Sequence, residues 1–449
     1  MADLLLFNAR DSHGRRIEAA VADGRVWLQG RPSAAAERID CGGGRLMPGL
    51  CDHHIHLMAS AAALSSLDVS GLGDDAFAER LGHAARQGPV RAIGADNADR
   101  LDADALDRIA GSVPVRVQAR TGGLWVLNSA ALDQLEHRTL PDAFERDRNG
   151  RPTGRVWRGD AFLRHTESEP PDLAALGSSL AGWGVTALTD ASVTTDDRQA
   201  DILASSGLPQ RLNLMSGGSL RSDPRWTVSA RKIVLDDRAL PAIGEVADRI
   251  GQARVEGRPA AIHAVTYAEL AVALAAYESV GAHAGDRIEH GAMIPVEAIP
   301  IVAALGLTVV SNPGFVAVHG DRYIREVPEG DHCDLYRLES LRRVGIPLAA
   351  GSDSPYGPLN PWAIMRAASD RRTAAGRQLG GTEALHPEHA LGLHCPAPDL
   401  RDGDEADLVV LAPGAQPGLD LDPVAMTMIA GRLVHRRSAP GGTRPGEPQ

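Results

Sequence analysis

The sequence almost lacks lysine. Of its 46 lysines and arginines, Lys232 is the only lysine, in the segment SARKIVLDD at residues 229–237. Arginine is never deprotonated in a protein, whereas a desolvated lysine amine can lose its proton and react, including with carbon dioxide to form an anionic carbamate. A salt bridge to Asp236 or Asp237 is the simpler interpretation of this stretch alone. The rest of the chain has to decide between the two.

Three other absences narrow the class of protein. The four cysteines are widely spaced and form no CxxC pair, which argues against a disulfide framework and a cysteine zinc knot. The net charge is −12 and no basic run is present, which argues against nucleic acid as a partner. No 18-residue apolar run occurs, and the N-terminal LLLF is too short for a signal peptide. We therefore expect a cytoplasmic protein with no membrane partner.

What the chain does contain is typical of a large globular protein. Its 449 residues are 43% hydrophobic and 23% charged, enough for a sizeable core and more than one domain or one large barrel. A homodimer is the common assembly of soluble enzymes and is our expectation here.

The two ends of the chain share one pattern, short strands separated by glycine turns. LLLFNAR near the start and EADLVVLAP near the end are examples. We predict one small β-sandwich built from residues 1–48 and 396–440, and a disordered tail at 441–449.

Between the ends, short apolar runs alternate with amphipathic helices, which predicts parallel strands buried on both faces. Residues 58–178 do not fit this repeat and are predicted to form an insertion after the first strand. Eight strands with helices indicate a distorted TIM (β/α)8 barrel over residues 49–395. A doubly wound open sheet is the alternative, but the chain has no glycine-rich dinucleotide turn. The eight predicted strands lie at 45–56, 184–192, 210–217, 231–237, 259–265, 286–294, 307–313 and 346–354.

Side chains that can bind metal recur near the ends of these strands. They are His54, His56, Lys232, His263, His290 and Asp353. Each alone has a structural explanation, such as a histidine hydrogen-bonded in a core or an aspartate that caps a helix. In a closed barrel, however, all of them would meet at the mouth where TIM-barrel active sites lie. The set therefore predicts a metal site.

The charge of this set explains the single lysine. Four imidazoles and one carboxylate carry too little negative charge to hold two divalent cations close together. A carbamylated lysine supplies a bridging anion, which arginine cannot do. Burial and neighbouring cations both favour the loss of the amine proton that this reaction requires.

The motifs resemble the amidohydrolase superfamily. MPGLCDHHIHL is similar to its first-strand signature, and Lys232, His263 in AIHAV, His290 in RIEHG and Asp353 in GSDSP match its other metal positions. LWVLNSAAL, GVTALTDA, RKIVLDD and GSDSPYGPLNP are similar to the branch that includes N-substituted formamide deformylases (amidohydrolase family 3). The resemblance implies a distorted TIM barrel with a β-sandwich, which agrees with the fold read from the strand pattern.

The chain also departs from this branch. Gly122 replaces a histidine, Val265 and Thr266 replace Gly-Asp, GAD at 94–96 replaces GWD, and the insertion is shorter. These positions are expected near the substrate pocket, so the substrate can differ from formamides.

The resemblance implies a hydrolase that cleaves the C–N bond of an amide, formamide or cyclic amide by attack of a metal-bound hydroxide. Two divalent ions, expected to be zinc, would be bridged by N6-carboxylated Lys232. One ion would be held by His54, His56 and Asp353, and the other by His263 and His290. Asp353 would be the catalytic proton shuttle, and Asp52 would orient the histidine pair.

Other interpretations remain open at this point. Trp125, Asn128 and Arg120 could contact the small-molecule substrate, although core packing, turn formation and a solvated strand end explain them equally well. A mononuclear zinc deaminase of a heterocycle is the alternative enzyme, with Lys232 only a charge partner. A non-catalytic barrel acting as a binding module is the third possibility, but such proteins tend to lose ligands, and here every ligand position is filled.

Overall fold

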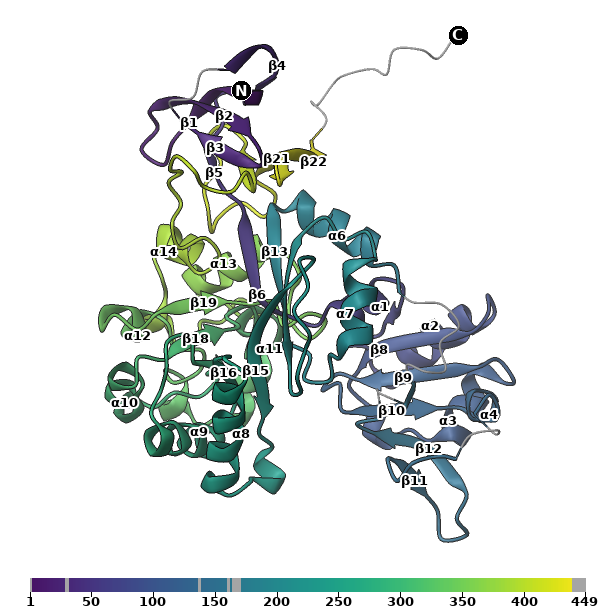
Figure 1. Ribbon diagram of the computed structural model, residues 1–449. Coiled ribbons are helices and arrows are strands. Elements are labelled where there is room, and N and C mark those ends of the chain that lie inside the picture. Colours follow the sequence, from purple (N-terminus) through teal and green to yellow (C-terminus); the bar gives the residue numbers. More distant parts are fainter. Residues whose placement is uncertain (1, 29–31, 136–138, 160–161, 164–170, 438–449) are drawn as a thin grey trace, which may run out of the picture. The chain divides into compact units, whose positions relative to one another are not determined.

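The computed structural model describes residues 2–28, 32–135, 139–159, 162–163 and 171–437 (Figure 1). The chain divides into two compact units, one formed by Met1–Leu57 with Leu173–Gln449 and the other by Met58–Asp172. The tail predicted to be disordered, 441–449, lies outside the described residues. Across the described part of the chain, no helix is both long enough and apolar enough to cross a membrane.

The first unit contains the predicted barrel. Eight parallel strands run in chain order around one sheet, β6-β13-β14-β15-β16-β17-β18-β19. Past the end of β19, the Asp353 amide donates to the His54 carbonyl at 2.8 Å, and the His56 amide donates to the Ser354 carbonyl at 3.1 Å, so the last strand region returns to the first. Strand order and closure confirm the barrel and exclude the doubly wound sheet. The strands are β6 Leu50–Ile55, β13 Val185–Asp190, β14 Arg211–Ser216, β15 Thr227–Val234, β16 Ala260–Ala264, β17 Arg287–His290, β18 Thr308–Ser311 and β19 Leu348–Ala350.

Helices alternate with these strands and bury their apolar faces against them. Ile262 of β16 and Ile288 of β17 are completely buried, together with Val246 and Ala273 of the helices outside them. In Figure 1 this part of the barrel runs from teal to green. The helices of the unit are α6 Leu173–Gly182, α7 Asp197–Ala204, α8 Ile243–Val255, α9 Tyr267–Val280, α10 Ile299–Ala304, α11 Gly314–Glu326, α12 Glu339–Arg343, α13 Pro361–Asp370 and α14 Pro387–Gly392.

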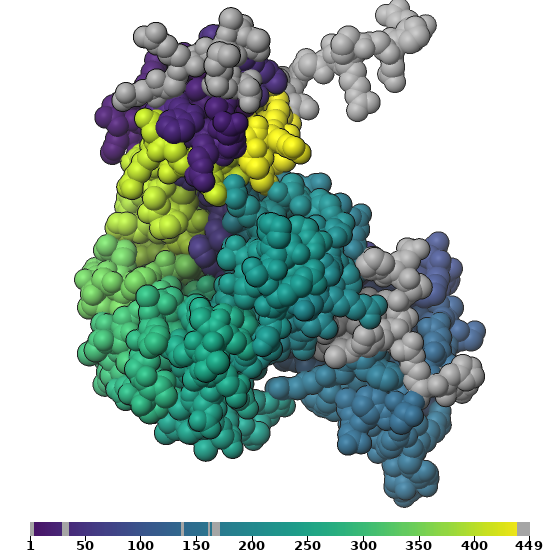
Figure 2. All heavy atoms as spheres, viewed as in Figure 1, coloured from purple at the N-terminus to yellow at the C-terminus, as the bar shows by residue number. Residues whose placement is uncertain are grey.

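Both chain ends contribute to a β-sandwich, as predicted. One sheet is formed by β1 Ala2–Arg10, β2 Arg16–Ala22, β3 Arg25–Trp27 and β4 Pro32–Asp40, and the other by β5 Leu46–Pro48, β20 Leu408–Leu411, β21 Val424–Ile429 and β22 Arg432–Arg436. Their apolar side chains share one core that includes Leu4, Leu6, Leu46, Leu408 and Met428. In Figure 2 the purple N-terminal atoms lie beside the yellow atoms of the C-terminal strands.

Two details of the sandwich did not follow from the strand pattern. The first sheet is mixed, because the hairpin β2–β3 occupies one edge of β1 and β4 pairs in parallel with the other. The strand expected at 45–56 is divided, with β5 in the sandwich and β6 in the barrel. Gly49 makes this division possible, since a Cβ atom there would lie 2.1 Å from Thr186 Oγ1. The first barrel strand is thus tied directly to the sandwich.

The second unit, Met58–Asp172, has a six-stranded sheet in the order β11-β12-β10-β9-β8-β7. Its core includes Phe77, Leu81, Leu106, Val117 and Val126. The segment LWVLNSAAL and the residues before it form β9, β10 and the start of α4. The elements are β7 Leu67–Asp68, β8 Val90–Ala95, β9 Val115–Ala119, β10 Leu124–Leu127, β11 Phe144–Arg146, β12 Pro152–Trp157, α2 Asp74–Ala85, α3 Ala103–Ala110 and α4 Ser129–Asp133, with α1 Leu57–Leu64 at the chain's entry.

Candidate metal centre

The six side chains that the sequence singles out as metal ligands come from five barrel strands or the residues just after them. His54 lies in β6, Lys232 in β15, His263 in β16 and His290 at the end of β17, while His56 and Asp353 follow β6 and β19. His54, Lys232, His290 and Asp353 are each less than 7% exposed. Residues as far apart in the chain as His54 and Asp353 are thereby brought to one end of the barrel.

Three of these residues form a compact group. One ligand atom from each of His54, His56 and Asp353 lies within 4.8 Å of the other two. Asp353 Oδ1 is 3.4 Å from His54 Nε2 and 3.2 Å from His56 Nε2. Buried polar atoms are normally hydrogen-bonded, but His54 Nε2 and Asp353 Oδ1 have no hydrogen-bond partner among the described residues. Lone pairs that converge in this way fit a cation.

His263 and His290 continue the group. Their ring centroids are 4.5 Å apart, and the rings of His290 and His54 are 4.6 Å apart. His290 Nδ1 lies 3.8 Å from Asp353 Oδ2. The four histidines and the aspartate therefore form one continuous cluster.

Lys232 is buried beside this cluster, and its Nζ has no hydrogen-bond partner within the described chain. The carboxylate within ion-pair distance is that of Glu289, whose Oε2 lies 4.0 Å from Nζ. Asp236, suggested by the simpler interpretation, pairs with Arg238 at 3.2 Å. Burial lowers the pKa of Lys232, although the charges of Glu289 and Asp353 oppose the shift. The amine is therefore easier to deprotonate than an exposed lysine.

Each of three histidines is held through its other ring nitrogen. Nδ1 of His54 contacts Oε2 of Glu289. Nδ1 of His290 lies 2.8 Å from Oδ1 of Asn312, and Nδ1 of His56 lies 3.2 Å from Oγ of Ser192. Such contacts fix the tautomer and leave Nε2 available to a metal.

These supporting residues were not identified from the sequence. Glu289 is completely buried, and its second oxygen contacts Nε of Arg287 two residues earlier on the same face of β17. A charged pair two positions apart in an otherwise buried strand is the sequence signal that could have revealed it. Asn312 directly follows β18 and has no comparable signal.

Asp52 connects the two ends of the barrel sheet. Its Oδ1 accepts hydrogen bonds from the backbone amides of His54 at 3.1 Å and Ser352 at 3.0 Å. Burial raises the pKa of Asp52 to about 6, in spite of these bonds. Asp52 thus contacts the histidine pair through the backbone of β6, and its role in orienting the pair stays a prediction.

The protonation states suit metal ligands. Burial lowers the pKa of His54 and His290, and lowers that of His263 to about 2, so all three rings are neutral near pH 7. Neutral imidazole is the form that binds metals. Burial alone would raise the pKa of Asp353, but the neighbouring histidines keep it below its usual value, so the carboxylate is ionised.

Two residues of the cluster also have a strained backbone. His290 and Asp353 have φ angles of 69° and 50°, in the left-handed region that residues other than glycine rarely adopt. Such conformations persist only where the surrounding structure enforces them, and they cluster at functional sites.

The three residues suggested to contact substrate lie in the unit Met58–Asp172. Trp125 is buried in β10, with the guanidinium groups of Arg91 and Arg116 at 5.0 and 5.6 Å from its ring. Asn128 caps α4, and Arg120 pairs with Asp96. Each thus has a partner within its own unit, and a contact with substrate stays a prediction.

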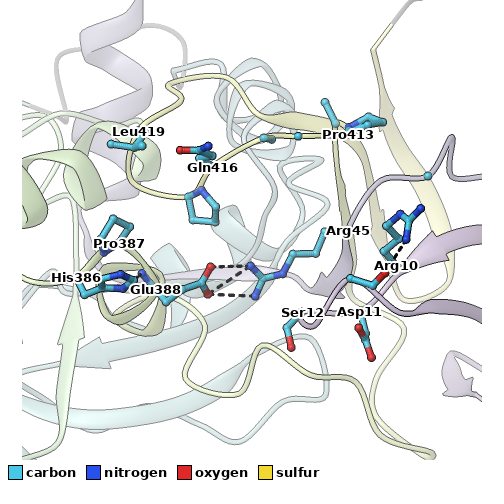
Figure 3. A pocket seen from close by; sticks show the side chains of 16 residues that line it. Arg10, Asp11, Ser12, Arg45, His386, Pro387, Glu388, Pro413, Gln416 and Leu419 are labelled. Atoms are coloured by element: carbon cyan, nitrogen blue, oxygen red, sulfur yellow. Dashed lines mark hydrogen bonds and ion pairs between the residues drawn. The ribbon is translucent and has the colours of Figure 1, made fainter.

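A second concave region lies between loops of the sandwich and α14 (Figure 3). This cleft has a volume of about 430 Å³. Figure 3 shows Arg45 and Glu388 directed toward one another, 3.0 Å apart at their closest atoms. Arg10 donates to the carbonyl of Gly14 at 2.6 Å. Because these charged groups are already paired, the barrel mouth is the stronger candidate for chemistry.

A barrel with a histidine and aspartate cluster at its mouth defines a class of metal-dependent hydrolases, and comparison with known proteins agrees. Residues 37–435 match the amidohydrolase family. The chain is 28% identical to the N-substituted formamide deformylase of Arthrobacter pascens, over 94% of both chains. It shares its fold with metal-dependent hydrolases from Pyrococcus horikoshii (TM-score 0.73, 21% identity, 93% of this chain and 98% of that one) and Pyrococcus furiosus (0.69, 20%, 92% and 99%).

The chain belongs to the amidohydrolase family, as its motifs suggested. It is a hydrolase that acts on carbon–nitrogen bonds in small molecules.

Proposed function

We propose that this protein is a binuclear metal-dependent amidohydrolase. The observation that carries the proposal is the group formed by His54, His56 and Asp353, in which the buried atoms His54 Nε2 and Asp353 Oδ1 have no hydrogen-bond partner among the described residues. A cation is the group that satisfies such a set, and mixed imidazole and carboxylate ligands suit zinc.

The neighbouring residues fit a second ion. In our proposal His54, His56 and Asp353 would hold one zinc ion, His263 and His290 would hold the other, and Lys232, as a carbamate, would be a ligand to both. The carbamate forms when the neutral amine adds carbon dioxide and releases a proton. The unpartnered, buried Nζ and the lowered pKa of Lys232 support this reaction. Arg at this position could not undergo it.

The bound ions would supply Lewis acidity and a water with a pKa of about 7, compared with 15.7 in bulk solvent. Asp353 takes the proton from the attacking water and transfers it to the leaving nitrogen. Its carboxylate is available because its pKa is held below the usual value. Glu289 and Asn312 keep His54 and His290 in one orientation during this transfer.

We propose an amide, formamide or cyclic amide as substrate. The relationship to the N-substituted formamide deformylase supports this class. The departure at Val265 and Thr266 supports a different member of it. Here Thr266 caps α9 and the Val265 amide donates to Glu269 at 2.7 Å, so this pair shapes the start of the helix.

Metal content and product analysis test the proposal together. We expect purified active protein to carry close to two zinc ions per chain by elemental analysis. It should release a carboxylic acid and an amine, or a ring-opened acid, from a panel of amides. No more than trace metal in active protein would contradict the mechanism. One ion per chain and release of ammonia from a heterocycle would indicate the deaminase instead.

A further inference from the structure

Two of the buried histidines in the cluster are supported by chemically different partners. His54 Nδ1 contacts a carboxylate, Glu289, whose other oxygen contacts Arg287. His290 Nδ1 donates to a neutral amide, Asn312, which in turn donates from Nδ2 to the Gly351 carbonyl at 2.8 Å. Both arrangements fix a tautomer, but only the first places a negative charge behind the ring.

That difference matters because both contacts are buried. His54, Glu289 and Asn312 are 0% exposed. In such surroundings electrostatic effects are larger than in water, and an anionic acceptor makes a ligand imidazole more basic. The amide has no net charge and gives His290 much less of this effect.

The carboxylate of Glu289 is itself fixed in place. Arg287 contacts it through Nε and donates from Nη2 to the His53 carbonyl at 3.0 Å, so the guanidinium bridges β17 and β6. The acceptor therefore cannot rotate away from the His54 ring without losing Arg287.

We propose that Glu289 is a positioning residue that makes the two metal positions unequal. The ion held through His54 is the tightly retained one, and the ion held through His290 and His263 is lost first. This inference rests on the proposed function, since it presupposes two ions. It adds that the enzyme has a half-loaded state in which the first position alone is filled.

Stepwise removal of metal from the holoenzyme tests the proposal. Samples are dialysed against increasing concentrations of a zinc chelator, and the zinc that remains per chain is measured. The wild type should lose its two ions in separate steps. Glu289→Gln keeps the shape and removes the charge, so it should shift the later step alone, to about 10–100-fold weaker retention.

Asn312→Ala is the matched variant, and it should weaken the earlier step alone. Equal shifts of both steps in either variant, or no shift in Glu289→Gln, would overturn the proposal. A wild type that holds no stoichiometric zinc would instead contradict the proposed function. The two failures are therefore distinguishable.

A measurement on the wild type avoids any dependence on folding of the variants. In metal-depleted protein labelled with ¹⁵N-histidine, His54 should carry its proton on Nδ1, with the Nδ1–H resonance shifted downfield by the charged acceptor. The His290 resonance should be shifted less. His54 protonated at Nε2, or two equivalent resonances, would overturn the proposal even if Glu289→Gln failed to fold.

Discussion

Asn128 and His54 are both 0% exposed, yet the hydrogen bonding of their side chains differs. In the unit Met58–Asp172, Oδ1 of Asn128 accepts from the amides of Val115 and Ala131, and Nδ2 donates to Val113 and Gly111. In the barrel, Nε2 of His54 has no hydrogen-bond partner in the described chain.

This difference distinguishes a buried side chain that stabilises the fold from buried side chains that form a binding site. Leaving a buried polar atom unpaired costs about 1–3 kcal/mol, so two such atoms next to one another indicate a place for a bound group. Asn128 stabilises its own unit through four bonds. His54 Nε2 and Asp353 Oδ1 lie 3.4 Å apart, and neither atom has a hydrogen-bond partner among the described residues, which fits a binding site for a cation.

The largest effect is expected at Asp353. Asp353→Asn keeps the shape but removes an anionic ligand and the proton shuttle, so turnover should fall by ~10²–10⁴-fold or more. Steady-state kinetics on the best amide substrate measure it, with zinc content determined on the same samples. Near-normal turnover would show that the proton is handled by another group.

Lys232→Arg is expected to be the next most damaging change. It keeps the positive charge but cannot form a carbamate, so the loss should at least match the ~10–100-fold typical for residues that support a metal ligand. Lys232→Ala should be equally damaging. Turnover and metal content measured together decide the matter. If Arg retains two ions and normal turnover, Lys232 is only an ion-pair partner of Glu289.

Removing the side chain of Asn128 should lower the stability of the protein more than its catalytic activity. Asn128→Ala leaves several backbone groups of its unit without partners and removes the cap of α4, at a cost of about 1–3 kcal/mol. Chemical denaturation measures the loss. KM should stay near the wild-type value if the side chain is purely structural. A clear increase in KM would support the contact with substrate that the sequence suggested.

The smallest effect is expected at His394. Like His54 Nε2, its Nε2 has no hydrogen-bond partner among the described residues, but His394 is not part of the metal-ligand group. Burial lowers its pKa to about 4, although a bond to the Cys51 carbonyl opposes this. An unfolded histidine titrates near 6.5. Between pH 6.5 and 4 the unfolded chain therefore binds a proton that the folded protein does not, and stability falls as the pH is lowered.

His394→Asn should flatten this dependence between pH 6.5 and 4, as followed by denaturant unfolding at a series of pH values. It should leave metal content unchanged. A loss of zinc in this variant would extend the site beyond the cluster at the barrel mouth and weaken the contrast drawn above.

Much of the fold could be predicted from the periodic pattern of apolar residues in the sequence. Continuously apolar runs such as PAAIHAV predicted buried parallel strands, and each of the eight predicted segments overlaps a barrel strand. The positions of His263 and Asp353 near strand ends followed from the same repeat. The register of the first strand did not, because the break at Gly49 depends on the approach of Thr186 from another strand.

The residues that hold the metal ligands in place were harder to predict from the sequence for the same reason. Whether Glu289 faces His54 depends on the register between β17 and a strand 235 residues earlier in the chain. Asn312 reaches His290 and Gly351 only in the closed barrel. A local pattern reports which face a residue occupies, but it does not report which distant side chain it meets.

The shared sandwich core has a consequence for synthesis on the ribosome. Met47 in β5 pairs with Val409 in β20, and Leu4 and Leu6 are buried with Leu408 and Met428. The N-terminal strands therefore wait for roughly 360 further residues, which at about 5–20 residues per second takes on the order of 20–70 s. During that interval their apolar faces are exposed to other nascent chains. Early strands of this protein should accordingly depend on chaperones until the last hairpin leaves the exit tunnel.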